Sequence, residues 1–339
     1  MRNTQQQVIQ RLEKETLRSF DKIVAFGMNG VEKTWNKAKQ RMEDAISKIY
    51  MDAFKSSTWN IVDATRMGLL RKIDMMVGAI LSEYQEESVR SVSRVLREIY
   101  KDSVFHHAWM LDQVTPPSIK VKVPESPVLL EADNNVMIRT YKGPDSDTTW
   151  KVRWSAWQDA YRDALYQNLR LGALNESSLA DARAEVNATR PGSPQSDMWD
   201  AFKRILEHQS EVSFVLAAMD VAVANPEMDV EEVWQTRYYD RVCEVCQDNE
   251  GLTRQETNEE IPAHPNCGCY WRLVPRTWAS LLKRGSDEDK KLARAMDAHG
   301  EVPNSMMVFN NEGKLVGSVV VKFNEWIEDH EMSVRGGTR

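Results

Sequence analysis

The sequence predicts a mainly α-helical protein with a small α+β module near its C-terminal end. Three observations predict it: apolar residues at three- and four-residue steps over most of the chain, short alternating segments, and four cysteines gathered between residues 243 and 269. The chain has 339 residues, 42% of them hydrophobic and 28% charged, which is the composition of a globular protein with two or three cores. We expect long N-terminal helices and short β-hairpins.

Residues 1–115 are predicted to form an N-terminal helical region. Their apolar residues recur at helical spacing, as at Val8, Leu12, Leu17 and Phe20. This pattern is typical of long helices that bury one face against each other or against a partner. The dipeptide Pro116-Pro117 ends the region, because proline cannot continue a helix.

Two adjacent histidines, His106 and His107, stand near Trp109 at the end of this region. Neighbouring side chains on a helix point in different directions, so the pair is not expected to share a metal ion. We interpret it as a surface or interface feature at the helix end.

Residues 116–154 are predicted as a small β segment or an arm. Two stretches alternate apolar and polar residues, as half-buried strands do: Ile-Lys-Val-Lys-Val over 119–123 and Trp-Lys-Val-Arg-Trp over 150–154. A turn signal, Gly143-Pro144-Asp145, stands between them.

Residues 155–275 are predicted to begin with a helix at Ser155. After a proline-containing loop at 187–196, a second helix is expected over 197–223, and Asn225-Pro226 stops it. The cysteine-rich segment follows this helix.

Residues 276–339 are predicted to contain a polar helix or pair of helices and a β-hairpin. The helical part is expected over 276–298. Apolar stretches flank Asn310-Asn311-Glu312-Gly313, which is a good hairpin turn.

The cysteines and one histidine form a pattern typical of a zinc site. The arrangement is C-x2-C, then a long insertion, then H-x2-C-x-C, with Cys243, Cys246, His264, Cys267 and Cys269 as candidate ligands. Zinc takes four such ligands in a tetrahedron, so five candidates are one more than it needs. We expect Cys243, Cys246, His264 and one of the last two cysteines. Cys269 is favoured over Cys267 because it lies further beyond the proline-constrained turn.

Three other interpretations of the cysteines carry less weight. The polar N-terminus has no signal-peptide core, and thiols stay reduced in the cytosol, which disfavours disulfides. Acidic residues surround the C-x2-C pair and disfavour the free thiolate that a redox pair needs. A catalytic zinc needs an open ligand position and a general base, whereas here four protein ligands are at hand. A structural zinc ion is therefore expected.

The residues around this cluster resemble the signature of the phage head morphogenesis family related to protein F of phage Mu. The resemblance covers roughly residues 155–275 and is sharp over 234–271. Gly268 stands where the family usually has arginine between the last two cysteines. The match reads Trp234-x-Thr236, Asp240-Arg241-Val242-Cys243-x2-Cys246, Gly251 and Pro262-x-His264-Pro265-x-Cys267-x-Cys269.

The resemblance implies a minor head (minor capsid) protein of a tailed bacteriophage, present in few copies at the portal vertex or inside the head of the virion. Such a protein acts in head assembly, DNA packaging or ejection, and is made in the host cytoplasm. Its implied partners are the portal protein, the major capsid or scaffold protein and packaged DNA. No enzymatic activity is expected.

There are two further expectations, one about the turn next to the metal site and one about membrane-spanning segments. Asp240 and Arg241 are expected to fix that turn, by contacting the metal ligands or as an ion pair. No stretch approaches the roughly 18 uninterrupted apolar residues of a membrane span, so none is expected.

An alternative function is a zinc-containing nuclease that processes phage DNA. It would require a further pair of catalytic histidines near the metal, and His208, His299 and His330 are scattered along the sequence. A DNA-binding zinc module is disfavoured by charge, since residues 181–270 hold 7 lysines and arginines against 18 acidic residues.

Overall fold

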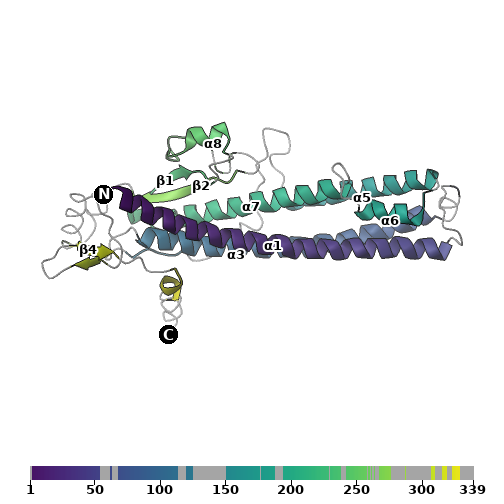
Figure 1. Ribbon diagram of the computed structural model, residues 1–339, viewed down its shortest axis with the longest axis horizontal. Coiled ribbons are helices and arrows are strands. Elements are labelled where there is room, and N and C mark those ends of the chain that lie inside the picture. Colours follow the sequence, from purple (N-terminus) through teal and green to yellow (C-terminus); the bar gives the residue numbers. More distant parts are fainter. Residues whose placement is uncertain are drawn as a thin grey trace. The chain divides into compact units, whose positions relative to one another are not determined.

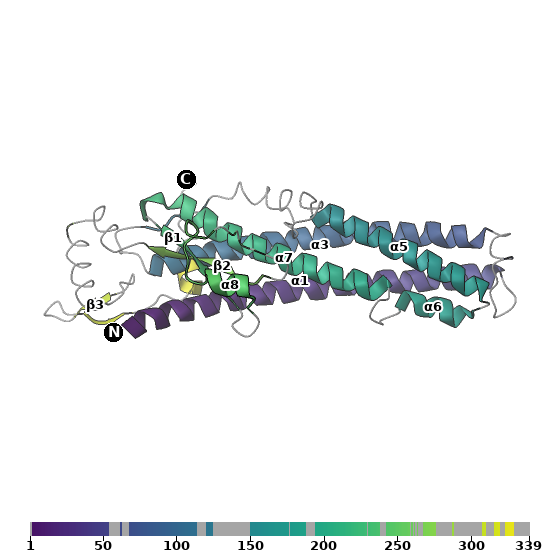
Figure 2. The ribbon, with the colours of Figure 1, turned by 90° about the horizontal axis from the view of Figure 1, so that it is seen from above.

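The computed structural model confirms a mainly α-helical fold with small β-sheets (Figures 1 and 2). The structure describes residues 2–53, 62, 68–113, 120–124, 150–175, 177–187, 194–228, 230–237, 242–257, 259, 261, 263, 267–275, 287, 307–309, 315–318 and 323–328. Among these residues, no helix combines the length and the apolar character that crossing a membrane requires.

The named elements are long helices followed by short strands and short helices (Figure 1). The helices are α1 (Arg2–Ala53), α3 (Leu69–Gln113), α5 (Trp150–Leu174), α6 (Leu179–Asn187), α7 (Pro194–Ala224), the 3-10 helix η1 (Pro226–Met228) and α8 (Glu244–Asn249). The strands are β1 (Val230–Gln235), β2 (Tyr270–Pro275), β3 (Met307–Phe309) and β4 (Leu315–Ser318). β1 pairs with β2 and β3 with β4, both antiparallel. The second pair confirms the predicted strands of the C-terminal hairpin.

The contacts group the chain into two compact units made of non-consecutive stretches. Unit 1 comprises Met1–Ile23, Arg97–Ala132 and Ser210–Arg339, and unit 2 comprises Val24–Leu96 and Asp133–Gln209. Three of the boundaries fall inside α1, α3 and α7, so each of these helices contributes residues to both units. The predicted segments are consecutive, whereas each unit joins stretches far apart in the sequence.

Unit 2 has an aromatic core that links α1, α3 and α5. The Trp35 ring lies 5.1 Å from Tyr84 and 5.4 Å from Tyr161, centroid to centroid, and Tyr84 lies 5.9 Å from Trp154. The Trp154 indole N–H donates a 2.9 Å hydrogen bond to Ser88 Oγ. Aromatic contacts of this kind stabilise a core beyond the apolar area that they bury.

Two features fix the spacing of the helices in unit 2. A Cβ atom at Gly27 would lie 2.7 Å from Cγ1 of Val95, so α1 and α3 approach each other closely at a residue without a side chain. The Arg162 guanidinium on α5 donates two 2.8 Å hydrogen bonds to the Asp74 carboxylate on α3. A two-point contact of this kind sets orientation as well as distance.

The interpretation of residues 150–154 as a strand is wrong, because they form the start of α5. Trp150 and Trp154 lie on one face in a strand and in a helix alike, since both periods bring residues four apart together. Val152 separates the two cases: a strand would place it beside the tryptophans, and it is in fact 56% exposed. The helix predicted from Ser155 thus begins earlier.

The predicted strand at 119–123 is also wrong in its described part, since residues 120–124 belong to no strand. The backbone N–H of Lys122 donates to Asn225 Oδ1 (2.7 Å), and Asn225 Nδ2 donates to the Lys122 carbonyl (2.8 Å). One amide side chain at the end of α7 therefore replaces a neighbouring strand. Val121, which is buried, fills part of the unit 1 core.

Unit 1 is built around the C-terminal part of α3. His106 and His107 are 2% and 0% exposed, so the interpretation of this pair as a surface feature is wrong. The His107 ring packs edge-to-face on Phe214 of α7, with 4.8 Å between centroids. Complete burial, followed by the nearby His106, lowers the pKa of His107 to about 3, because the charged imidazolium would lose its hydration.

Two further helices were predicted, and the structure describes only the first of them in full. The helix predicted over 197–223 is confirmed as α7, and it ends where Asn225-Pro226 was expected to stop it. The helix predicted over 276–298 lies outside the described residues, apart from Asp287, which is helical.

The buried neutral His107 predicts a stability that depends on pH. Its folded-state pKa of about 3 lies below the ordinary 6.5, so the unfolded chain binds the proton first. Its contribution is complete above pH 6.5 and is lost as the pH falls toward 3, at up to about 1.4 kcal/mol per pH unit. The free energy of unfolding from urea titrations at about pH 7, 6 and 5 should fall more steeply in the wild type than in His107→Leu. Equal slopes would contradict this assignment.

Candidate metal site

The β1–β2 ribbon carries all four cysteines in the connection between its strands. The register runs from Val230 opposite Pro275 to Gln235 opposite Tyr270, so the connection, residues 236–269, leaves and enters the ribbon at one end. Its last two cysteines directly precede β2, and another lies in the first turn of α8. The fold thus brings the two halves of the cysteine pattern to the same end of the ribbon.

After α8 the connection folds back along β1. The Trp234 N–H donates to the Leu252 carbonyl (2.7 Å), and the Gly251 N–H donates to the Trp234 carbonyl (2.9 Å). Arg254 continues this pairing, since its backbone N–H donates a 2.8 Å hydrogen bond to the Glu232 carbonyl. Gly251 has a φ of +83°, a conformation that favours glycine at this turn. β1 therefore lies between β2 and the returning segment, which holds α8 next to the ribbon.

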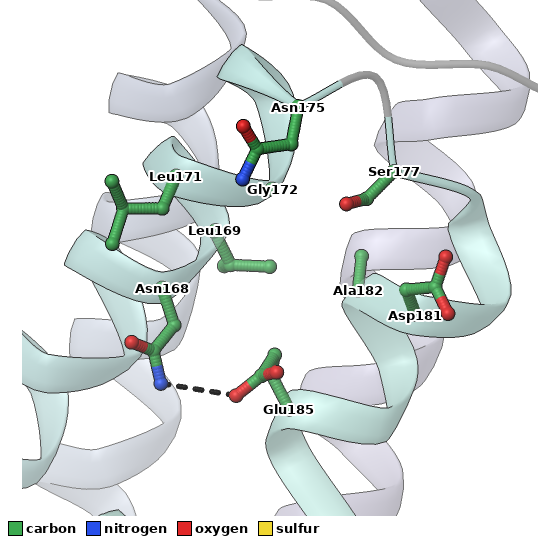
Figure 3. Close-up of a pocket in the computed structure, with 9 residues that line it drawn as sticks. All are labelled: Asn168, Leu169, Leu171, Gly172, Asn175, Ser177, Asp181, Ala182 and Glu185. Atoms are coloured by element: carbon green, nitrogen blue, oxygen red, sulfur yellow. Dashed lines mark hydrogen bonds between the residues drawn. The ribbon is translucent and has the colours of Figure 1, made fainter.

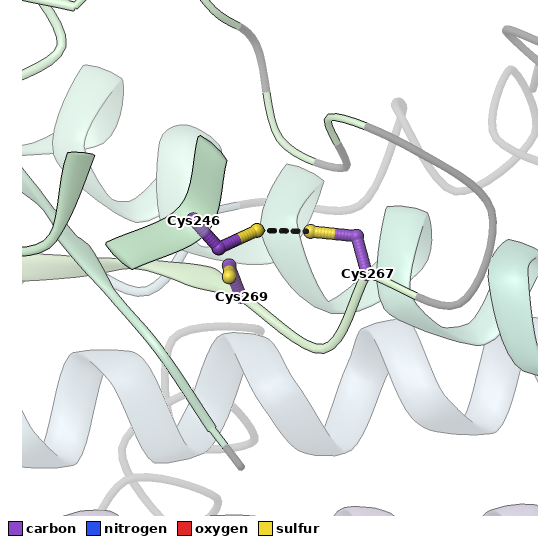
Figure 4. Close-up of side chains that lie close together, drawn as sticks. All are labelled: Cys246, Cys267 and Cys269. Atoms are coloured by element: carbon purple, nitrogen blue, oxygen red, sulfur yellow. Dashed lines mark hydrogen bonds between the residues drawn. The ribbon is translucent and has the colours of Figure 1, made fainter. Parts of the chain in front are cut away.

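Three buried cysteine sulfurs meet at this place (Figure 4). The Sγ atoms of Cys246, Cys267 and Cys269 all lie within 4.8 Å of one another, and those of Cys246 and Cys267 are 3.8 Å apart. All three residues are buried. A tetrahedral zinc site with bonds of about 2.3 Å has sulfurs about 3.8 Å apart, so the cluster has the dimensions of a metal site.

Cys243 is the fourth sulfur near the cluster. It occupies the N-cap position of α8 and is exposed, and its side chain makes no capping hydrogen bond to the helix. It lies within hydrogen-bonding range of the Cys246 thiol. The cluster of four cysteines is compatible with a bound metal ion.

The thiols of Cys246 and Cys269 both have raised pKa values. Burial, followed by the charge of Cys267, raises the pKa of the Cys246 thiol well above its usual range. The pKa of Cys269 is raised as well, first by its hydrogen bond with Cys267 and then by burial. A thiol that stays protonated is a poor nucleophile, and this applies to Cys246 and Cys269.

Three predicted site residues lie outside the described residues. His264, the predicted histidine ligand, is one of them, and so are Asp240 and Arg241, which are expected to fix the turn. The residues that the structure does bring together are the four cysteines.

The ionic contacts that fasten this end of the ribbon were not predicted. Arg237, two residues after β1, has a side chain that is only 4% exposed. It donates a 2.6 Å hydrogen bond to Glu211 of α7 and a second one to Asp21 of α1. Its guanidinium also lies over the Phe20 ring, 4.4 Å from the centroid. The sequence shows here only an arginine in an acidic segment, which does not reveal its partners.

Glu211 connects this contact with the cysteine cluster. Burial raises its pKa to about 8, Arg237 opposes that rise, and the nearby Cys267 adds to it. Arg237 is thus the neighbour that favours the charged form of this buried carboxyl, and Cys267 disfavours it.

Aromatic contacts stabilise the ribbon and pack it against α7. Trp234 and Trp271 face each other across the two strands, with 5.4 Å between ring centroids, and both are fully buried. Tyr270 packs edge-to-face on Phe214 at 5.7 Å. These ring contacts hold the ribbon without any contribution from the sulfurs.

A separate pocket of about 380 Å³ lies between α5 and α6 in unit 2 (Figure 3). Asn168 Nδ2 donates a 3.0 Å hydrogen bond to Glu185 across it. The lining mixes amide, hydroxyl, carboxylate and apolar groups: Asn168, Leu169, Leu171, Gly172, Asn175, Ser177, Asp181, Ala182 and Glu185. The cysteine cluster is the stronger candidate site, because within the described part of the chain it alone joins three close metal-binding side chains.

Comparisons with known proteins add no further evidence on the site. No family model matches the chain, and no curated protein or solved structure is significantly similar to it.

The buried Arg237 contact predicts a large effect of its removal. Arg237→Met should lower the free energy of unfolding by about 2 kcal/mol, because the buried Glu211 carboxyl loses the hydrogen bond that Arg237 donates to it. The matched control is Arg254→Met: Arg254 pairs with Glu232 at 3.0 Å, but its side chain is 33% exposed. Its loss should cost less than about 1 kcal/mol. Equal costs in urea titrations would refute the role given to Arg237.

Proposed function

We propose that the four cysteines hold one structural zinc ion, and that the module it closes belongs to a minor head protein of a tailed bacteriophage. The observation that carries the proposal is the buried three-sulfur cluster at the end of the β1–β2 ribbon. It falls within residues 234–271, where the resemblance to the head morphogenesis family is sharp.

The donor set favours zinc over harder metals. Thiolates are soft ligands that select zinc, copper(I) or iron–sulfur chemistry, whereas magnesium and calcium prefer oxygen. The 3.8 Å separation of the Cys246 and Cys267 sulfurs fits the edge of a zinc tetrahedron. Both Cys267 and Cys269 lie in the cluster, which supports a four-cysteine site completed by Cys243.

A structural role is supported by the burial of the cluster. Catalytic zinc keeps one position open to water or substrate, whereas four protein thiolates close the coordination sphere. A bound metal would fasten α8 to the segment that leads into β2. Such a metal supplies folding energy to a segment with little core of its own.

The assembly role rests on the resemblance and on charge. The acidic balance of residues 181–270, with 7 basic against 18 acidic residues, suits contact with a protein rather than with DNA phosphates. The portal protein is the proposed partner, with the major capsid or scaffold protein as a second contact. The proposed location is the portal vertex or the head interior.

Metal analysis of variants tests the ligand set. The purified wild type should hold about one zinc per chain, and Cys267→Ser and Cys269→Ser should each lose most of it, because both sulfurs bind. The control is His264→Ala, which should keep its zinc if the four cysteines are the ligands. Zinc lost from His264→Ala and kept in Cys267→Ser would contradict the four-cysteine set.

Quantitative mass spectrometry of purified phage particles tests the assembly role. A minor head protein should be present at a few copies per particle when its peptides are scaled to those of the portal subunit. Its absence from particles would count against a structural role in the head.

An assay for nuclease activity tests the alternative function. A structural site predicts no cleavage of plasmid DNA with any divalent metal. Cleavage that disappears in a folded His264→Ala variant would replace the structural role with a catalytic one.

A further inference from the structure

The four cysteines of the cluster differ sharply in their exposure to solvent. Cys246, Cys267 and Cys269 are 2%, 1% and 3% exposed, whereas Cys243 is exposed. Cys243 stands at the N-cap of α8, directly before the helix that carries Cys246. A small reagent dissolved in water therefore reaches one sulfur of the cluster directly, and the other three only after the module opens.

This exposure makes Cys243 the reactive sulfur of a zinc-loaded cluster. Cysteine binds zinc as a thiolate, and the thiolate is the form of the side chain that attacks an oxidant. In the metal-free protein the acidic residues around the C-x2-C pair disfavour that form. The reactivity of Cys243 thus depends on the bound metal, and this step rests on the proposed zinc site.

Cys246 is the sulfur best placed to react with an oxidised Cys243. Its thiol lies within hydrogen-bonding range of Cys243, and the two residues are three apart in the C-x2-C turn. C-x2-C pairs form disulfides between close neighbours on the chain. Cys267 lies 3.8 Å from the Cys246 sulfur, but it is buried and belongs to the other half of the pattern. We therefore expect the disulfide within the C-x2-C pair.

We propose that Cys243 is the site at which hydrogen peroxide oxidises this protein, and that the Cys243–Cys246 disulfide that follows releases the zinc ion. The Cys243 thiolate attacks one peroxide oxygen, the O–O bond breaks, hydroxide leaves, and a sulfenic acid forms on Cys243. The Cys246 thiolate then attacks that sulfur, the S–O bond breaks, and a second hydroxide leaves. Two electrons pass from the sulfurs to the peroxide, and the two hydroxides take up two protons to become water.

The disulfide removes two of the four ligands. Cys267 and Cys269 alone cannot complete the tetrahedron that zinc requires, so the metal leaves. α8, which carries Cys246, is then no longer fastened to the segment that leads into β2. The ring contact between Trp234 and Trp271 involves no sulfur and remains. Peroxide therefore opens the connection and leaves the β1–β2 ribbon in place.

Zinc release and disulfide mapping on the full-length protein test the proposal. The zinc content is measured first, excess hydrogen peroxide is added, and the released zinc is followed with a chromogenic chelator. Free thiols are then alkylated and the chain is digested without a reductant. Trypsin cuts after Arg241, Arg254 and Arg272, so the two cysteine pairs fall in separate peptides, 242–254 and 255–272.

The expected result is zinc release together with a 242–254 peptide that is two hydrogens lighter and takes up no alkyl group. A reductant with added zinc should reverse both changes. A disulfide that joins the two peptides, or one within 255–272, would overturn the proposal.

Two matched variants separate reaction at Cys243 from general oxidation of the cluster. Cys243→His and Cys267→His each exchange one sulfur for a nitrogen that zinc also accepts. Per bound zinc, Cys243→His should release the metal about tenfold more slowly than the wild type, because its exposed ligand is no longer a thiolate. Cys267→His keeps the exposed sulfur and should react at the wild-type rate. Equal rates in the two variants would refute the role of Cys243.

The starting zinc content distinguishes this proposal from the proposed function. A purified protein that holds no zinc would overturn both the structural zinc site and its oxidation. Zinc that is present and stays bound in excess peroxide would overturn the oxidation alone.

Discussion

Among its described residues, the connection between β1 and β2 buries few side chains, and the structure of the module follows from that constraint. Of its described residues, the buried ones are Thr236, Ile261 and the three cysteines of the cluster. Such a segment cannot offset the entropy of ordering its backbone through a core of its own. The contacts that hold its described part include the backbone hydrogen bonds of residues 251–254 to β1 and the sulfur cluster that joins α8 to the segment before β2.

Arg237 stands between this polar connection and the apolar ribbon. Its contacts with Glu211 and Asp21 fasten the end of β1 to α7 and α1, close to the point where the connection begins. A buried guanidinium costs free energy unless its partners are in place, so it constrains where the ribbon can sit more than it adds to net stability. The ring contact between Trp234 and Trp271 buries apolar surface of the ribbon, and the contacts of Arg237 determine where the ribbon sits.

The sequence could predict what depends on local patterns, such as α7 from helical periodicity and the meeting of the cysteines from their spacing. It failed at residues 150–154, whose outer tryptophans face one way in a strand and in a helix. It also failed where distant segments supply the burial: the pair His106 and His107 suggested a surface or interface feature, but Phe323 stacks on His106 and Phe214 of α7 packs on His107. Arg237 pairs with one carboxylate on α1 and one on α7. The first, Asp21, lies outside residues 155–275, so no spacing pattern within that segment could predict it.

The aromatic contacts of the β1–β2 ribbon and the sulfur cluster are separate sets of interactions, and this separation limits what metal binding can change. The ribbon is held by tryptophan packing and by the Arg237 hydrogen bonds, neither of which involves a sulfur. Without metal, burial and the neighbouring Cys267 raise the pKa of the Cys246 thiol, so this thiol stays protonated. Losing the proposed zinc would therefore loosen the closure of the connection, while β1 and β2 stay in place. The part of unit 1 that a bound metal would order is then α8 with the segment before β2.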